Sequence, residues 1–377
     1  MPTELNFKSN RTRHSSILSS CLIYFGGKLM KRSILLFCLL ALIAIVLPVS
    51  AQSGTLNVLC TPQEVWCEGM AAAFEAKYPE IDVEWLRMSS GEALAKVMSE
   101  NGAPTYDIWW GGPMDSFVAA SAADLLEVYD SPNYENILED QKDLFISPKK
   151  DYVGIYVGSL SFNTNTEFLK EYEGLEAPKS YEDLLKPEFK GQIVMAHPST
   201  SGTAYTFVST VLQIMGEEAG WEYLKKFNDQ VAMYTKSGAG GGKFVANNEF
   251  GMVIMFSHDA VKEIDDNGAP LVITFPEEGT GFEVGSQAIL KGAKNLENAK
   301  LWFDWAISAE AQQLGPEYQA YQAPTVKGVE LSHPELLEVK LIDYDFEWSG
   351  EHRQEFQDKF ANEIQNAEAD EEGLIKK

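Results

Sequence analysis

The feature that most constrains the fold is a regular alternation of short apolar strands and helices that begins at Leu56. After the strand at residues 56–59, four large side chains recur at four-residue spacing, as on the buried face of a helix. They are Trp66, Met70, Phe74 and Tyr78. Residues 81–85 then alternate apolar and polar side chains as a strand does. Strands joined by helices of this length form a parallel, doubly wound sheet, so we expect an α/β fold that binds ligands beyond the carboxyl ends of its strands.

The alternation continues long enough to build two α/β lobes. A third strand ends at Gly111-Gly112-Pro113, and the apolar run at 153–162 predicts a strand that leaves the first lobe. Two crossings between the lobes imply a hinge with a ligand cleft between them. We predict lobe 1 at residues 52–155, lobe 2 at 156–275, a return to lobe 1 at 276–320, and C-terminal helices with an acidic tail at 321–377.

The N-terminal segment predicts export. Lys31 and Arg32 precede a 16-residue apolar run, Ile34–Val49, which is too short to span a membrane and ends in the small residues of a signal-peptidase site. We therefore expect a leader at residues 1–51, with a signal peptide at 30–51 cleaved after Ala51 and with residues 1–29 lying upstream of the true start. The alternative is an uncleaved membrane anchor. The expected location of the mature chain is periplasmic or otherwise extracytoplasmic.

Composition limits the partners of the mature chain. Removing residues 1–51 takes away six of the 30 basic residues and one of the 56 acidic ones, which leaves a formal charge of −31. Nucleic acid and anionic membranes are therefore poor partners, and we expect neither. The two cysteines that remain, Cys60 and Cys67, form a close pair in an exported chain, for which we expect a structural disulfide.

The most informative motif is a hydroxyl-rich stretch at residues 197–206, between a predicted strand and a predicted helix. Free backbone N–H groups and the helix dipole at such a start bind anions, and the hydroxyls of Ser201 and Thr203 beside Gly202 add donors without bulk. The alternative is simple N-capping of the helix, which needs only one hydroxyl.

Two further segments offer the same chemistry. Ser89 and Ser90 follow the second strand and precede a helix, so they either cap that helix or reach a ligand from the other lobe. The Gly-rich segment at 236–243 contains Ser237 and Gly238 but lacks the spacing of a P-loop, so it is either a turn or a loop whose backbone approaches the ligand.

Three titratable residues complete the candidate site. His258 and Asp259 follow an apolar strand, and Glu283 begins the segment that returns to lobe 1. They offer acceptors for sugar hydroxyls or a site for a metal, whereas the alternative gives them structural roles as a core residue and a helix cap. Because His258 and Asp259 are adjacent, we expect their side chains to point in different directions.

At these residues the chain resembles the ferric-type branch of the family 1 extracellular solute-binding proteins of ABC importers. The resemblance implies a type II periplasmic-binding fold, in which two lobes close on a ligand and dock on a membrane permease. Ferric binders of this branch use adjacent tyrosines, and this chain has His258-Asp259 where that pair would stand and no Tyr-Tyr pair anywhere.

The pattern is most similar to members that bind hexose phosphates. By that similarity Ser201, Gly202 and Thr203 would hold phosphate, while His258, Asp259 and Glu283 would hold sugar hydroxyls. Gly112, Ser89, Ser90, Ser237 and Gly238 complete the expected ligand residues. The alternatives are a ferric or other metal receptor, or a binder of phosphonate or phosphoglycerate.

No catalytic function is expected, because the sequence has no Gly-x-Ser-x-Gly motif and no free cysteine paired with a histidine. We expect a monomer without cofactor or resident metal, whose partners are a small anionic solute and an ABC permease.

Overall fold

The computed structural model describes residues 53–365, 368–369 and 375–376. The predicted leader and its cleavage site lie outside the described residues. Within them, no helix combines the length and apolar character needed to cross a membrane.

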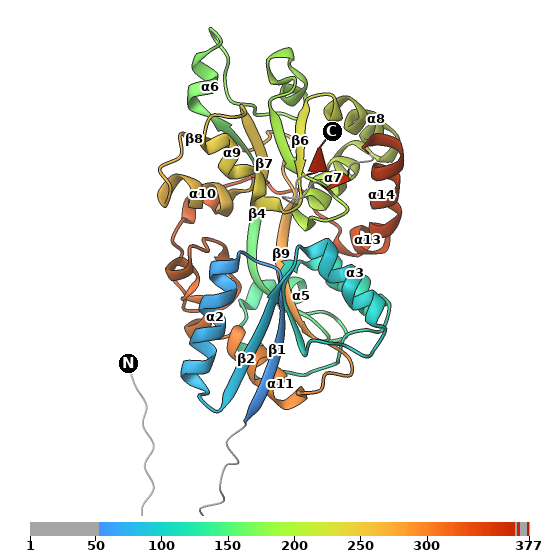
Figure 1. Cartoon of the computed structure of the whole chain (residues 1–377), viewed down its shortest axis with the longest axis vertical. Helices are drawn as coiled ribbons and strands as arrows, with labels where there is room; N and C mark the ends of the chain where they lie inside the picture. The colour runs from blue at the N-terminus through green and yellow to red at the C-terminus, as the bar shows by residue number, and fades with distance from the viewer. Residues whose placement is uncertain (1–52, 366–367, 370–374, 377) are drawn as a thin grey trace, which may run out of the picture. The chain divides into compact units, whose positions relative to one another are not determined.

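The first lobe begins with the predicted alternation of strands and helices (Figure 1). Strand β1 pairs in parallel with β2 on one side and with β3 on the other. Side chains from these strands and from the flanking helices form one hydrophobic core, which includes Phe74, Trp109 and Trp302. The elements are β1 (Gly54–Cys60), α2 (Glu64–Lys77), β2 (Ile81–Arg87), α3 (Ser90–Glu100), β3 (Ile108–Pro113), α4 (Met114–Ala122) and α5 (Lys142–Phe145).

Two long strands, β4 (Val153–Asn165) and β9 (Phe282–Ile289), run between the lobes (Figure 1). The first half of β4 pairs antiparallel with β9, and its second half pairs antiparallel with β7 and β8 of lobe 2. Within each lobe the predicted parallel pairing is present, and the antiparallel pairs are an addition to it. Strand β4 leads from lobe 1 to lobe 2 and β9 leads back, so these two neighbouring strands run in opposite directions.

The second lobe surrounds its own hydrophobic cores, which include Phe162, Tyr205 and Val253. In its sheet β5 pairs in parallel with β6 and with β7. The elements are α6 (Thr166–Lys170), β5 (Ile193–Ala196), α7 (Gly202–Met215), α8 (Glu217–Asn228), β6 (Val231–Thr235), α9 (Gly242–Ala246), β7 (Met252–Phe256), α10 (Ser257–Asp265) and β8 (Leu271–Thr274).

The chain after β9 contributes to both lobes. The helices α11 (Leu296–Ala306) and α12 (Ala309–Gln312) add to lobe 1, and β10 (Ala323–Pro324) pairs with β4. The helices α13 (Phe346–Glu351) and α14 (Arg353–Lys359) follow. Two short strands then extend the lobe 2 sheet at β6, where the sequence suggests only a tail: β11 (Glu368–Ala369) and β12 (Ile375–Lys376).

Candidate functional site

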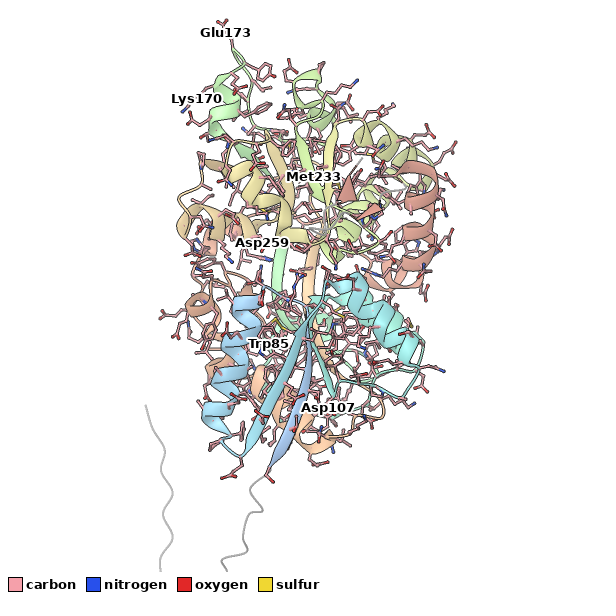
Figure 2. The ribbon with its side chains drawn as sticks, viewed as in Figure 1. Trp85, Asp107, Lys170, Glu173, Met233 and Asp259 are labelled. Atoms are coloured by element: carbon pink, nitrogen blue, oxygen red, sulfur yellow. A yellow bond between two sulfur atoms is a disulfide. The ribbon has the colours of Figure 1, made fainter. Side chains whose placement is uncertain are left out.

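A polar pocket lies where the two lobes meet, at the carboxyl ends of their strands. It encloses about 470 Å³ of empty space, part of it open to solvent. Thr61, Arg87 and Pro113 reach it from the ends of β1, β2 and β3, and Phe256 reaches it from the end of β7. Figure 2 shows Asp259 at the level where the lobes meet. The pocket is therefore built at the edge of the sheets where open α/β folds bind ligands.

Five helices begin at the pocket. At least one residue from the first turn or N-cap of each helix belongs to its lining. These residues include Gln63 for α2, Ser90 for α3, Pro113 for α4, Gly202 for α7 and His258 for α10. Because free N–H groups and the positive ends of helix dipoles converge there, the pocket favours an anion.

Ten of the eleven predicted ligand residues line this pocket. They are Ser89, Ser90, Gly112, Ser201, Gly202, Thr203, Gly238, His258, Asp259 and Glu283. The eleventh, Ser237, is the N-cap of the short turn at Gly238–Gly241 and does not belong to the lining. Its backbone carbonyl instead accepts hydrogen bonds from Thr235 Oγ1 and Gly240 N, because the Gly-rich segment turns tightly there.

Some of the hydroxyl groups cap helices, as the alternative interpretation predicts. The Ser201 hydroxyl accepts a hydrogen bond from the Ala204 N–H at 3.4 Å, and Ser89 forms a capping box with Glu92. Both serines therefore cap helices and line the pocket at the same time. Gly112 is required beside them, because its φ is +99° and a Cβ there would lie 2.8 Å from Ser90 Oγ.

Arg87 is the guanidinium that sequence reasoning missed. Its Nε donates to the Pro62 carbonyl at 3.1 Å, and its Nη1 contacts Ser89 Oγ at 3.4 Å. Burial lowers its pKa, although an arginine side chain in a protein stays protonated. The available signal was the alternation of β2, which places Arg87 on the same inward face as Ile81 and Val83.

The lining also carries a cluster of buried titratable groups. His258 Nε2 lies 3.8 Å from Asp259 Oδ2 and 3.7 Å from Glu283 Oε1, distances too long for hydrogen bonds. Burial lowers the pKa of His258 to about 3, raises that of Asp259 to about 6, and raises that of Glu283 well above its ordinary value. At neutral pH the imidazole is therefore neutral, with one ring nitrogen as donor and the other as acceptor, and burial favours the protonated form of Glu283, so the cluster offers both donors and acceptors to a neutral polar group.

Several buried polar atoms in the lining have no hydrogen-bond partner among the described residues. They are Thr61 Oγ1, Gln63 Oε1, His258 Nδ1 and Gln322 Oε1. Leaving a buried donor or acceptor unpaired costs about 1–3 kcal/mol. A polar ligand that paired with these atoms would recover that cost, so their positions favour a solute with several hydroxyl groups.

A profile of known families decides the class of the protein. The profile described as "Bacterial extracellular solute-binding protein" matches residues 111–348. The chain belongs to this family. It is a solute-binding protein of ABC transport and not an enzyme, as the sequence predicts.

Relatives of this solute-binding protein agree with that assignment. An uncharacterised protein of Haemophilus influenzae is 38% identical over 343 residues, which cover 87% of this chain and 96% of that protein. The solved structure of the periplasmic binding protein AfuA from Actinobacillus pleuropneumoniae, with exogenous fructose-6-phosphate bound, is 39% identical. It has a TM-score of 0.79, and the match covers 83% of this chain and 99% of that one. Apo ferric ion-binding protein A of Pasteurella haemolytica is 21% identical with a TM-score of 0.67, and the match covers 82% and 97% of the two chains. That likeness concerns the fold.

The two lobes of the solute-binding protein touch across the pocket. The Gly91 N–H donates to the Thr200 carbonyl at 3.0 Å, and Lys236 Nζ lies 2.7 Å from Glu92 Oε1. Gln63 Nε2 also donates to Asp259 Oδ1 from the opposite lobe. These contacts join α2 and α3 to lobe 2, so this is a closed arrangement of the lobes.

The His258 cluster differs from expectation in one respect. His258 and Asp259 both line the pocket, although adjacency predicts different directions, because the first turn of a helix can present two successive side chains to a space beyond its end. In the part of the chain that the structure describes, no group of three or more His, Cys, Asp or Glu residues is arranged to hold a metal ion.

A disulfide supports the pocket from lobe 1. Cys60, at the end of β1, is bonded to Cys67 in the first turns of α2, with 6.1 Å between their Cα atoms. The loop that it closes carries Thr61, Pro62 and Gln63, which all line the pocket. This covalent link therefore restrains three residues of the lining.

Proposed function

We propose that this protein captures a hexose phosphate in the interlobe pocket and delivers it to a membrane permease. The observation that carries the proposal is the division of one pocket into two chemical parts. Arg87 and the starts of α3 and α7 favour a phosphate, and the buried cluster of His258, Asp259 and Glu283 suits the hydroxyls of a sugar.

Two other considerations support this ligand class. The relative AfuA, 39% identical, has fructose-6-phosphate bound in its solved structure. The buried carboxyl groups of Asp259 and Glu283 disfavour a second anionic group such as a carboxylate, and the unpaired acceptor oxygens of Gln63 and Gln322 suit the hydroxyl donors that a sugar supplies. A hexose phosphate meets both requirements.

The test uses isothermal calorimetry and thermal shift with fructose 6-phosphate, glucose 6-phosphate, fructose and inorganic phosphate, and with phosphoglycerate, a phosphonate and ferric ion as the alternative ligands. We expect either ester, at a hundred times its Kd, to stabilise the protein by about 2.7 kcal/mol, and the two fragments to bind far more weakly. A response to phosphoglycerate, phosphonate or ferric ion without one to the esters would overturn the proposal.

Arg87→Gln tests the phosphate end separately. Removing the guanidinium should weaken binding of the esters by about tenfold to a hundredfold, because a charge-assisted hydrogen bond is worth about 1.5–3 kcal/mol. The weak affinity for fructose should not change. Ser201→Ala with Thr203→Val should also reduce affinity for the esters. A large decrease in the melting temperature of the free protein would instead favour helix capping as the role of these two residues.

We also propose that the chain is exported and that residues 1–51 are removed. Mass spectrometry of the mature protein should find Gln52 at the N-terminus. An intact apolar segment at residues 34–49 would instead support a membrane anchor.

A further inference from the structure

The strongest feature outside the pocket is a buried ion pair between the two lobes. Arg353 Nη1 lies 2.5 Å from Asp115 Oδ1, and each side chain is 1% exposed. Asp115 belongs to the first turn of α4 in lobe 1, and Arg353 begins α14. The guanidinium also lies over the ring of Tyr205 in α7, with its Cζ 4.2 Å from the ring centre. One side chain thus contacts both α4 and α7.

The segment around Arg353 is a third connection between the lobes. Phe346 of α13 packs into the lobe 1 core, whereas Phe356 of α14 packs into the lobe 2 core. Gly350 lies so close to α4 that a Cβ there would be 2.6 Å from Val118. Gln357 Nε2 donates to the Pro198 carbonyl, just before α7, at 2.7 Å. Movement of one lobe against the other must therefore strain or rearrange this segment.

The two helices that Arg353 joins both begin at the pocket. Pro113, the N-cap of α4, and Gly202, the first residue of α7, belong to the pocket lining. They are also in close contact, because a Cβ on Gly202 would lie 2.7 Å from Pro113 Cδ. A change in the angle between α4 and α7 would therefore move two helix starts that line the pocket.

The hydrogen bonding of the pair is incomplete. Arg353 Nε, Arg353 Nη2 and Asp115 Oδ2 are buried and have no hydrogen-bond partner among the described residues. When polar atoms of a buried ion pair stay unpaired, the free-energy cost of removing both charges from water is not fully offset. Replacing such a pair by apolar side chains is therefore often neutral or stabilising. Stability of the folded chain is thus a poor explanation for this pair, whereas a fixed geometry is a good one.

We propose that Arg353 is a positioning residue for ligand binding, which sets the angle between α4 and α7 and so the closed arrangement of the lobes. The inference rests on the proposed function for its choice of ligand, though not for its structural readout. Arg353 itself does not line the pocket.

The test replaces the pair by apolar side chains, Asp115→Leu with Arg353→Met. We expect a melting temperature equal to or above that of the wild type. We also expect affinity for fructose 6-phosphate to fall about tenfold, as for a typical coupling between two sites. Small-angle X-ray scattering of the free variant should give a larger radius of gyration than the wild type. An unchanged affinity together with an unchanged radius would overturn the proposal.

Two further variants test whether the effect is specific to Arg353. Lys96→Met with Glu100→Leu removes an ion pair that lies within α3 alone, and it should change neither affinity nor radius. Arg353→Lys keeps the charge but loses the planar contact with Tyr205. If the apolar double variant does not fold, this variant should still weaken binding and enlarge the free protein, and wild-type values for both would refute the role.

The two proposals fail in different ways. A wild-type protein that binds no hexose phosphate contradicts the proposed function, while the radius of the free variants still tests Arg353. A wild-type protein that binds the ester with variants that bind it equally well contradicts only the role of Arg353.

Discussion

At the residue scale, the pocket depends on side chains whose ionisation is set by burial. Asp259 is 5% exposed, and desolvation raises its pKa to about 6 from an ordinary 3.8. Between these values the folded chain binds a proton that the unfolded chain has released. The free energy of unfolding therefore falls as pH rises through this range, and above pH 6 the ionised carboxylate destabilises the free protein.

Asp259→Asn should remove the destabilisation that the buried, ionised carboxylate causes. We expect the free energy of unfolding to rise by about 1–3 kcal/mol at pH 7, with little change at pH 4, because the carboxyl is then already protonated in the folded state. Affinity for a hexose phosphate should fall. Chemical denaturation at the two pH values measures the first effect, and an equal gain at both would show that the carboxyl is not shifted.

Some residues of the pocket could be predicted from the sequence and others could not. The hydroxyls at Ser89, Ser90 and Ser201 were predictable because capping and anion binding need the same residue types at a helix start. Gln322 was not, because it reaches the pocket from a segment near β10 whose position depends on pairing with β4 across more than 150 residues. Local patterns carry no information about such a distant contact.

At the element scale, the starts of helices form most of the site. The existence of helices α3 and α7 at these positions could be predicted, since both follow a strand and a cluster of hydroxyl residues. The C-terminal end of β4 was not predicted, because the polar residues Asn163 and Asn165 are typical of the loop that follows a strand. Both are fully buried, where their side-chain amides donate to the carbonyls of Val253 and Val245.

Gly202→Ala tests the contact between helix starts. The added methyl group would lie 2.7 Å from Pro113 Cδ and 3.1 Å from Ser90 Cβ, both in the other lobe. We expect the melting temperature of the free protein to stay near the wild-type value, and the ligand affinity to fall because closure is obstructed. Gly242→Ala, at the start of α9, is the control, since its nearest neighbour is the flexible Glu263 side chain of the same lobe. Equal affinities for the two variants would contradict this account of closure.

At the scale of the whole molecule, three connections join the two lobes around one pocket, and each lobe has hydrophobic packing of its own. The strands β4 and β9 cross between the lobes, and α13 and α14 pack on opposite sides of the same division. Contacts such as Lys236–Glu92 and Gly91–Thr200 form only when the lobes approach. A ligand that touches both lobes therefore stabilises closure by adding contacts that neither lobe can make alone.

The disulfide links stability to the site at this scale. Cys60→Ala with Cys67→Ala should lower the free energy of unfolding by about 2–3 kcal/mol, the value for a short loop. It should also weaken ligand binding, because Thr61 and Gln63 lose their restraint. Calorimetry with and without a reductant measures both effects in the wild type. A loss of stability with full affinity would show that the loop holds its shape without the bond.

The position of that disulfide also determines where the protein can complete its binding pocket. Reducing conditions in the cytoplasm keep cysteines as free thiols, and oxidising conditions outside it allow a disulfide to form. Under the export proposed above, the bond between Cys60 and Cys67 would form only after the chain has left the cytoplasm. The lining residues Thr61, Pro62 and Gln63 would then gain their covalent restraint only outside the cytoplasm, so we expect the chain to bind its solute more weakly before export than after it.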